Sequence, residues 1–322
     1  MKNKTLIAIA AMLLCVATAF GQKTLTILHT NDTHSCIMPL GETLADTVQT
    51  GRGGFLRRIA MLRQERAKDP NLLLFDSGDF SQGSPYYTLF KGNVEAGLMN
   101  QMGYAAGTIG NHEFDFGLEN MARLFKSLNF PIVCANYEFS EYDLQNIVKP
   151  YVILHHQGLK IGVFGLAPEL KGLVDQRNYG NTVYLDPVAT AQKMADLLRK
   201  QKCDLVICVS HLGWHEGGMG DQEVISHTRG IDLVLGGHSH TYFQTLRYAN
   251  NLDGKPIKVN DKDGNPILIG LVVVWRLKDA YKALFEVDLQ EKETKTVNTR
   301  MNALERFVSI QSDAALRQVA GQ

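Results

Sequence analysis

The sequence has no excess of charge, few cysteines and, beyond its first residues, no long apolar run. Its 33 Lys and Arg residues balance 33 Asp and Glu residues, which gives a formal net charge of zero. A balanced chain lacks the electrostatic footprint of a general nucleic-acid binder or a polybasic membrane module. With 45% hydrophobic and 20% charged residues, the composition also excludes a disordered tail and a coiled coil. We therefore expect a globular protein whose partners are small molecules.

The one long apolar run lies at the N-terminus. Two lysines precede the apolar residues 6–20, which are too short to span a bilayer and end in small residues suited to signal-peptidase cleavage. We interpret residues 1–21 as a secretory signal peptide with Gln22 as the mature N-terminus, and we expect a periplasmic or extracellular protein. The alternative is a lipoprotein anchored through Cys15, but Leu14 is large where a small residue is expected.

Four cysteines would remain after cleavage of the signal peptide. An even number in an exported protein allows two disulfides in principle. Three of the four lie in or beside short apolar runs, however, and so resemble small core residues. We therefore expect free thiols at Cys36, Cys134, Cys203 and Cys208.

Short apolar runs rich in Val and Ile alternate with segments of helical period, which is typical of an α/β protein. The expected strands are 24–29, 72–75, 106–109, 132–134, 160–166, 205–209 and 231–235. The expected helices cover 55–66, 118–128 and 188–200, the last with Asp186 as N-cap and Pro187 at its first position. After Thr241 we expect a second sheet or its edge, with strands 267–275 and 280–289. The sequence shows no internal repeat, low-complexity tract or linker.

Side chains of the types that bind metals follow five of the expected strands. They are Asp32 with His34, Asp79, Asn111 with His112 and Asp115, His211, and His238 with His240. In open α/β sheets, ligands bind beyond the carboxyl ends of the strands, so we expect these five ends to converge on one site. Each cluster alone is more typical of a turn or a solvated loop, but turn chemistry does not explain five of them in register.

Apart from His112 and Asp115, this set contains two Asp, one Asn and four His and no thiolate. Such donors suit two divalent ions such as Mn, Zn or Fe, and they disfavour a structural zinc site built on cysteine. Two ions about 3.5–4 Å apart need a bridging carboxylate, and they can hold a hydroxide as nucleophile while binding phosphoryl oxygens. The residues therefore predict hydrolysis of a phosphoester.

The same motifs resemble those of the calcineurin-like metallophosphoesterases. Within them, the sequence is similar to the secreted 5'-nucleotidase family, which includes UDP-sugar hydrolases and 2',3'-cyclic nucleotide phosphodiesterases. The matching motifs are ILHTNDTHS at 27–35, GRGG at 51–54, DSGD at 76–79, GNHEFD at 110–115, SHLG at 210–213 and GGHSH at 236–240. They occur in the family's order and cover most of residues 24–290. The resemblance implies a metallophosphatase fold, which is a four-layer α/β/β/α sandwich of two mixed sheets flanked by helices.

The resemblance also implies a role for each candidate residue. One ion would bind Asp32, His34 and His240, the other would bind Asn111, His211 and His238, and Asp79 would bridge them. His112 matches the family's catalytic histidine, and Asp115 matches its carboxylate partner. An imidazolium oriented by a carboxylate can stabilise charge on phosphoryl oxygens or protonate a leaving alkoxide.

Other conspicuous residues have structural interpretations. We expect His29 to be packed behind the ligand loop, and His155 and His156 to lie at the surface or in a turn. His215 could border the substrate pocket, although it matches no ligand position in the family. Arg52 stands in a Gly-rich loop that needs special backbone angles.

The resemblance is incomplete at the C-terminal end. Typical members carry a second domain that supplies aromatic residues for the base and arginines for the terminal phosphate or sugar. Here we expect 22–300 to form the catalytic domain and 301–322 a helical tail, with the nucleotide-specificity domain absent.

Two functions are consistent with these expectations. The principal hypothesis is an exported dinuclear phosphohydrolase that acts on nucleotides or other small phosphoesters, without binding nucleic-acid polymers or crossing a membrane. The rival is a half-enzyme or binding module that needs a separate chain carrying the substrate-binding domain.

Overall fold

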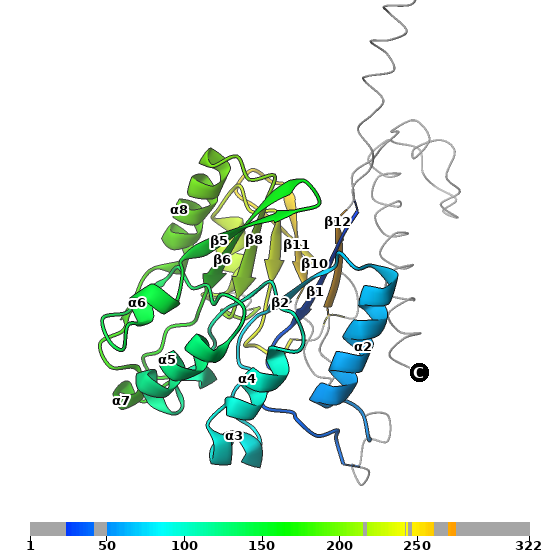
Figure 1. Ribbon diagram of the computed structural model, residues 1–322. Helices are drawn as coiled ribbons and strands as arrows, with labels where there is room; N and C mark the ends of the chain where they lie inside the picture. Colours follow the sequence, from blue (N-terminus) through cyan, green and yellow to red (C-terminus); the bar gives the residue numbers. More distant parts are fainter. Residues whose placement is uncertain are drawn as a thin grey trace, which may run out of the picture. The chain divides into compact units, whose positions relative to one another are not determined.

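The computed structural model describes residues 24–41, 50–214, 218–241, 243, 247–260 and 270–274 (Figure 1). The expected signal peptide, Cys15, His215, strand 280–289 and tail 301–322 lie outside the described residues. Residues Ile27–Val272 form one compact unit, which holds the site and all the elements below except the outer ends of strands β1 and β12. A second unit takes in the rest of the chain, of which only 24–26 and 273–274 are described. In the described part of the chain, no helix is both long enough and apolar enough to cross a membrane.

The smaller sheet contains the first strands of the chain. Its order is β12-β1-β2-β3, with β1 at Leu25–Thr30, β2 at Leu73–Asp76, β3 at Ala106–Gly107 and β12 at Gly270–Val274. β2 pairs in parallel with both β1 and β3, and all four residues of β2 are buried. Parallel strands covered on both faces have this continuous apolar character, which is why their runs are visible in the sequence.

The larger sheet has six strands in the order β10-β11-β9-β8-β6-β5. They are β5 (Tyr151–His156), β6 (Leu159–Leu166), β8 (Leu205–Ser210), β9 (Leu233–Leu235), β10 (Arg247–Asn250) and β11 (Pro256–Asn260). The four inner strands run parallel, whereas the outer strands β5 and β10 pair antiparallel with their neighbours, so this sheet is mixed. A separate two-stranded ladder joins β4 (Tyr137–Glu138) to β7 (Val183–Tyr184).

Helices connect the strands of both sheets (Figure 1). They are α2 (Phe55–Lys68), α3 (Pro85–Phe90), α4 (Asn93–Met99), the 3-10 turn η1 (His112–Phe114), α5 (Gly117–Ser127), α6 (Leu144–Ile147), α7 (Gln176–Tyr179), α8 (Pro187–Lys200) and α9 (Asp221–Ser226). Two sheets with flanking helices confirm the α/β class and the metallophosphatase architecture expected from the sequence.

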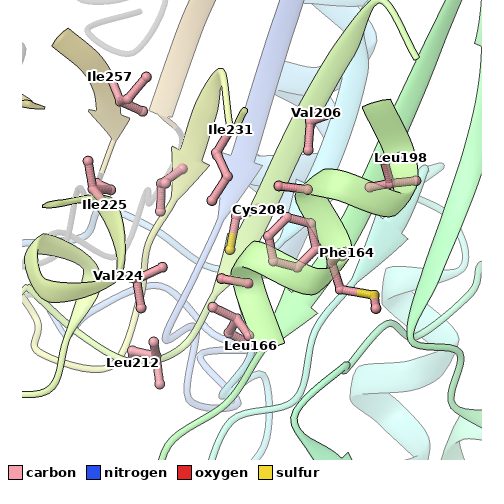
Figure 2. Packing of buried hydrophobic residues seen from close by; sticks show 14 of the residues in the cluster. Phe164, Leu166, Leu198, Val206, Cys208, Leu212, Val224, Ile225, Ile231 and Ile257 are labelled. Atoms are coloured by element: carbon pink, nitrogen blue, oxygen red, sulfur yellow. The ribbon is translucent and has the colours of Figure 1, made fainter. Parts of the chain in front are cut away.

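The core of the larger sheet lies under α8. Leu198 of this helix, Phe164 of β6 and Val206 of β8 belong to one cluster (Figure 2), and all three side chains are fully buried. Gly162 allows this close packing, because a Cβ at that position would lie 2.7 Å from a methyl carbon of Leu198. Cys208 also lies in this core. No disulfide joins the four described cysteines, and three of them are buried, as expected.

Several expected elements differ from the observed ones. In the expected strand 132–134, only Ile132 and Val133 form isolated bridges, and 106–109 shortens to two residues because the chain turns into the site after Gly107. Strands β10 and β11 were not among the expected strands; β10 is largely exposed, and β11 has only two buried apolar residues, Ile257 and Val259. His155 and His156 were expected at the surface or in a turn; both lie in the edge strand β5, where His155 is exposed and His156 is half-buried.

The N-cap of α8 provides a test of how the sequence specifies this helix. An Asp186 carboxylate oxygen accepts a hydrogen bond from the backbone N–H of Ala189 at 2.7 Å. We predict that Asp186→Ala lowers the free energy of unfolding by about 1 kcal/mol, because one of the free N–H groups at the helix start loses its acceptor. Urea denaturation would measure the change. The exposed Asp196→Ala in the same helix makes the same charge change and should cost less than about 0.5 kcal/mol, so equal losses would contradict the role of the cap.

Candidate metal centre

The structure brings the five predicted segments together at the carboxyl ends of the strands. The segments after β1, β2 and β3 come from the smaller sheet, and those after β8 and β9 come from the larger one. The backbone N–H of His238 donates to both carboxylate oxygens of Asp32, at 2.9 and 3.0 Å, across 206 residues of sequence. The two sheets thus build a single site.

Asp32, His34 and His240 form the first group of ligand-type side chains. One ligand atom from each lies within 4.8 Å of the others. The Nε2 atoms of the two histidines are 3.0 Å apart, and Oδ1 of Asp32 is 3.4 Å from Nε2 of His240. Asp32 is buried whereas His240 is exposed, so this group is accessible to solvent from the His240 side.

Asp79, His211 and His238 form a second group with the same spacing, and Asp79 also belongs to a third group with His34 and His112. Asp79 therefore lies between the two sets of histidines. Nε2 of His211 is 3.0 Å from Oδ2 of Asp79, but the geometry of this contact is not that of a hydrogen bond.

Asn111 follows β3. Its neighbour Gly110 packs against Asp79, a member of the second group. A Cβ at Gly110 would lie 2.1 Å from a carboxylate oxygen of Asp79, so only glycine allows the two segments to approach this closely. The amide oxygen of Asn111 is buried and accepts no hydrogen bond from the described residues. Buried acceptors without a partner are rare, and a carbonyl oxygen of this kind suits a divalent cation.

The backbone of this site is strained in a consistent way. Five of the ligand-type residues have positive φ, although none is glycine: Asp32 (46°), His34 (39°), Asp79 (54°), His238 (76°) and His240 (51°). The left-handed region is unfavourable for residues with a Cβ, and such residues cluster at functional sites where the surrounding structure enforces them.

The orientation of His211 is fixed by Ser77. Nδ1 of His211 is 2.5 Å from the carbonyl oxygen of Ser77, and because a carbonyl only accepts, Nδ1 carries the proton. In the neutral ring, Nε2 then carries a lone pair toward Asp79, as a metal ligand requires. The Ser77 hydroxyl donates to the carbonyl oxygen of Leu235 in β9, which links the two sheets beside the site.

Charge within the site follows from this geometry. Burial raises the pKa of Asp32, but the adjacent His211 and a hydrogen bond from His240 lower it overall. Burial likewise raises the pKa of Asp79, but the adjacent His211, together with His112 and His34, lowers that pKa overall. His211 has a pKa of about 10, because Asp79 and Asp32 outweigh the effect of its burial. A metal ion at Nε2 must therefore displace a proton, and its affinity should rise with pH.

His112 and Asp115 pair with each other beside the first two groups of ligand-type side chains. Nδ1 of His112 is 3.1 Å from Oδ2 of Asp115, and this hydrogen bond raises the pKa of His112. The rings of His112 and His34 meet edge to face with centroids 5.3 Å apart. The spacing alone would also allow His112 to act as a ligand with His34 and Asp79, but its Nδ1 is already engaged by Asp115.

Glu113 supports the site, although no role was expected for it within the GNHEFD motif. Its buried carboxylate accepts hydrogen bonds from the backbone N–H groups of Gly110 (2.7 Å), Asp79 (3.0 Å) and Ser81 (3.2 Å). Burial and the nearby Asp79 raise the pKa of Glu113 to about 7. One carboxylate thus joins the segment after β2 to the segment after β3. The signal available in the sequence for this role was an acidic residue within a motif that also contains an expected metal ligand.

The other described histidines and Arg52 are not members of the three groups of ligand-type side chains. His29 is buried in β1, and His227 is exposed at the end of α9. Among the described residues, neither belongs to a group of ligand-type side chains. Arg52 is exposed in its loop, where Gly51, Gly53 and Gly54 all have positive φ, as the Gly-rich motif predicts.

The role of Glu113 can be tested by an isosteric change. We predict that Glu113→Gln destabilises the protein by about 1–3 kcal/mol, because one amide N–H would face a backbone N–H donor in a buried position. Urea denaturation should be performed above the raised pKa of Glu113, where the carboxylate is ionised. The exposed Glu119→Gln in α5 makes the same chemical change and should have little effect. If both variants were equally stable, Glu113 would not join these segments.

Comparison with known proteins identifies the family. The family model described as calcineurin-like phosphoesterase matches residues 25–242. The chain is 32% identical over 250 residues to a 5'-nucleotidase from Diplobatis ommata, covering 76% of this chain and 42% of that protein. It is 34% identical over 248 residues to a snake venom 5'-nucleotidase from Gloydius brevicauda, covering 74% and 41%.

A solved structure has the same fold. The crystal structure of a 5'-nucleotidase precursor from Thermus thermophilus superposes with a TM-score of 0.71 at 31% identity, covering 78% of this chain and 51% of that one. The chain spans less than half the length of the curated relatives described above. The family model covers the chain from β1 to β9 and every segment that contributes a side chain to the groups of ligand-type residues. The protein therefore belongs to the calcineurin-like phosphoesterases, a family of metal-dependent phosphoester hydrolases.

Proposed function

We propose that this chain hydrolyses phosphoester bonds of nucleotides or related small phosphoesters with the help of two divalent metal ions. The position of Asp79 is the observation that carries the proposal. It lies between two groups of ligand-type side chains, each with ligand atoms within 4.8 Å of one another. A carboxylate in that position can bridge two cations, which is the arrangement that two-metal phosphoester hydrolysis requires.

The proposed ligand sets follow the two groups. Asp32, His34 and His240 hold one ion, Asn111, His211 and His238 hold the other, and Asp79 contacts both. The amide oxygen of Asn111 and Nε2 of His211 support the second set, since both are buried without a hydrogen bond to any described residue. Nitrogen and carboxylate donors without thiolate favour Mn, Zn or Fe.

Bound in this way, the ions would lower the pKa of the attacking water and offset negative charge on the phosphoryl oxygens. The chain itself supplies the proton for the leaving group. Asp115 orients His112 through Nδ1, so Nε2 carries the transferable proton of the imidazolium. As the bond from phosphorus to the leaving oxygen breaks, its electron pair stays on that oxygen, which takes the proton from His112.

We further propose that the protein is exported to the periplasm or the extracellular space. The apolar residues 6–20 behind two lysines support export. The names of the relatives, 5'-nucleotidase and snake venom 5'-nucleotidase, favour nucleotides as substrates. Whether a separate chain completes the substrate site is decided by the first experiment below.

We predict that metal-free protein reconstituted with Mn or Zn releases phosphate from adenosine monophosphate or an aryl phosphate. Asp79→Asn should lose bound metal together with activity, because a bridge between two dications needs the full carboxylate charge. The exposed Asp196→Asn serves as the matched control and should retain both. Metal content by mass spectrometry and phosphate release would be measured together. A metal-loaded protein with no turnover on any phosphoester would contradict the proposal, and turnover only after mixing with a second chain would indicate a half-enzyme.

His112→Gln separates proton donation from metal binding. We predict that this variant keeps both metal ions and loses about 100-fold or more in kcat, as expected when a general acid or charge-stabilising group is removed. Metal content and kcat would be compared with those of the wild type. Loss of metal from the variant would instead assign His112 to the ligand set.

A further inference from the structure

Glu95 is a buried carboxylate outside the proposed ligand sets and the His112–Asp115 pair. It is the third residue of α4, and its side chain is fully buried. An acidic residue in the first turn of a surface helix is ordinary, because it interacts with the free N–H groups of the helix start. A buried carboxylate costs free energy unless hydrogen bonds compensate it. The contacts of Glu95 therefore show what the carboxylate does at this position.

Glu95 contacts the segment that carries His34. Its Oε1 accepts a hydrogen bond from the hydroxyl of Ser35, the residue after His34, and Ser35 is fully buried as well. Oε2 of Glu95 is also buried and accepts no hydrogen bond from the described residues. Ser35 thus compensates part of the buried charge, and its hydroxyl joins the segment after β1 to α4.

The hydrogen bonds around Ser35 have a single direction. A carboxylate only accepts, so the one hydroxyl proton of Ser35 goes to Glu95. The Ser84 hydroxyl, 2.6 Å from that of Ser35, must then donate to it, and it accepts from the backbone N–H of Tyr86 at 3.2 Å. The donors therefore run from the start of α3 through Ser84 and Ser35 to Glu95. Hydrogen bonds that share a direction polarise and strengthen one another.

This chain of hydrogen bonds is attached to a strained stretch of backbone. His34 and Ser35 have φ of 39° and 50°, and two successive left-handed residues with a Cβ are unfavourable unless their surroundings enforce them. Their backbone N–H groups donate to the carbonyl oxygens of Asp79 and Phe80, both at 3.0 Å. Gly83 packs against the same stretch, since a Cβ there would lie 2.5 Å from the carbonyl oxygen of His34. The Ser35 side chain adds the link to α4.

We propose that Glu95 is a positioning residue for the metal ion that Asp32, His34 and His240 would hold. It acts through Ser35, which keeps His34 in the left-handed conformation that places its Nε2 atom 3.0 Å from that of His240. The inference rests on the proposed function, because it gives the first of the two ions a support outside its ligands. The second ligand set lies on the segments after β3, β8 and β9, so Glu95 affects the two ions unequally.

Metal content distinguishes positioning from a general loss of stability. At a free Mn concentration that just fills both sites of the wild type, we predict that Glu95→Ala retains about one Mn per chain, because the affinity of the first site falls about tenfold or more. Glu95→Gln keeps an oxygen that accepts from Ser35 and should retain two. Met99→Ala, a buried change in the same helix, should lower stability and also retain two. Mass spectrometry after equilibrium dialysis would give the counts.

A second variant removes the link from the other side. Ser35→Ala takes away the hydroxyl and should lower the affinity of the first site as much as Glu95→Ala does. The double variant should lose no more than either single variant, because both changes break the same hydrogen bond. Additive losses, an equal loss in Glu95→Gln or Met99→Ala, or two Mn ions retained by Glu95→Ala would overturn the inference.

Hydrogen exchange gives a readout that needs no metal. In the metal-free protein, Glu95→Ala should speed exchange of the backbone N–H groups of His34 and Ser35 about tenfold relative to those of β8. Met99→Ala should leave this ratio at the wild-type value. An unchanged ratio in Glu95→Ala would contradict the positioning role whatever metal the protein binds. A raised ratio, together with a wild type that binds fewer than two Mn ions, would contradict the proposed function and support the link from Glu95 to His34.

Discussion

The structure depends on holding two buried carboxylates, Asp32 and Asp79, within a few ångströms of imidazole rings. Burying a carboxylate costs free energy unless hydrogen bonds or positive charge compensate it. Backbone N–H groups supply part of this compensation, since His238 donates to Asp32 and His112 donates to Asp79 at 2.8 Å. The side chain of Asn31 also donates to Asp32 at 2.6 Å, and protonation of His211, whose pKa is about 10, adds positive charge beside both carboxylates. Divalent cations would provide the same charge at the position between the groups.

The two sheets meet this constraint because their strand ends face one site. The parallel register of β1, β2 and β3 brings the segments with Asp32, Asp79 and Asn111 to one edge, and β8 and β9 do the same for the histidines of the larger sheet. Gly110 permits the close approach of Asp79, and Gly237 permits that of Asp32, since a Cβ there would lie 3.0 Å from its carboxylate. Positive φ at the ligand-type residues is the cost of turning the chain sharply at each strand end.

Much of this arrangement was predictable from local patterns. Asp186 and Pro187 fixed the start of α8 through capping chemistry alone, and the five polar clusters after apolar runs predicted a convergent site. The connections between segments were not predictable in the same way. Glu113 accepts from the backbone N–H of Asp79, and the backbone carbonyl of Ser77 accepts from the distant ring of His211; no periodicity reports such contacts. The edge strand β5 was absent from the expected strands, because its mostly half-buried residues show no clear alternation.

The number and position of the metal ions are the central claim. Anomalous diffraction from crystals loaded with Mn would test it most directly. The account predicts two peaks about 3.5–4 Å apart, one beside Asp32, His34 and His240 and the other beside Asn111, His211 and His238, with Asp79 in contact with both. A single peak, or two peaks that Asp79 does not join, would contradict the account.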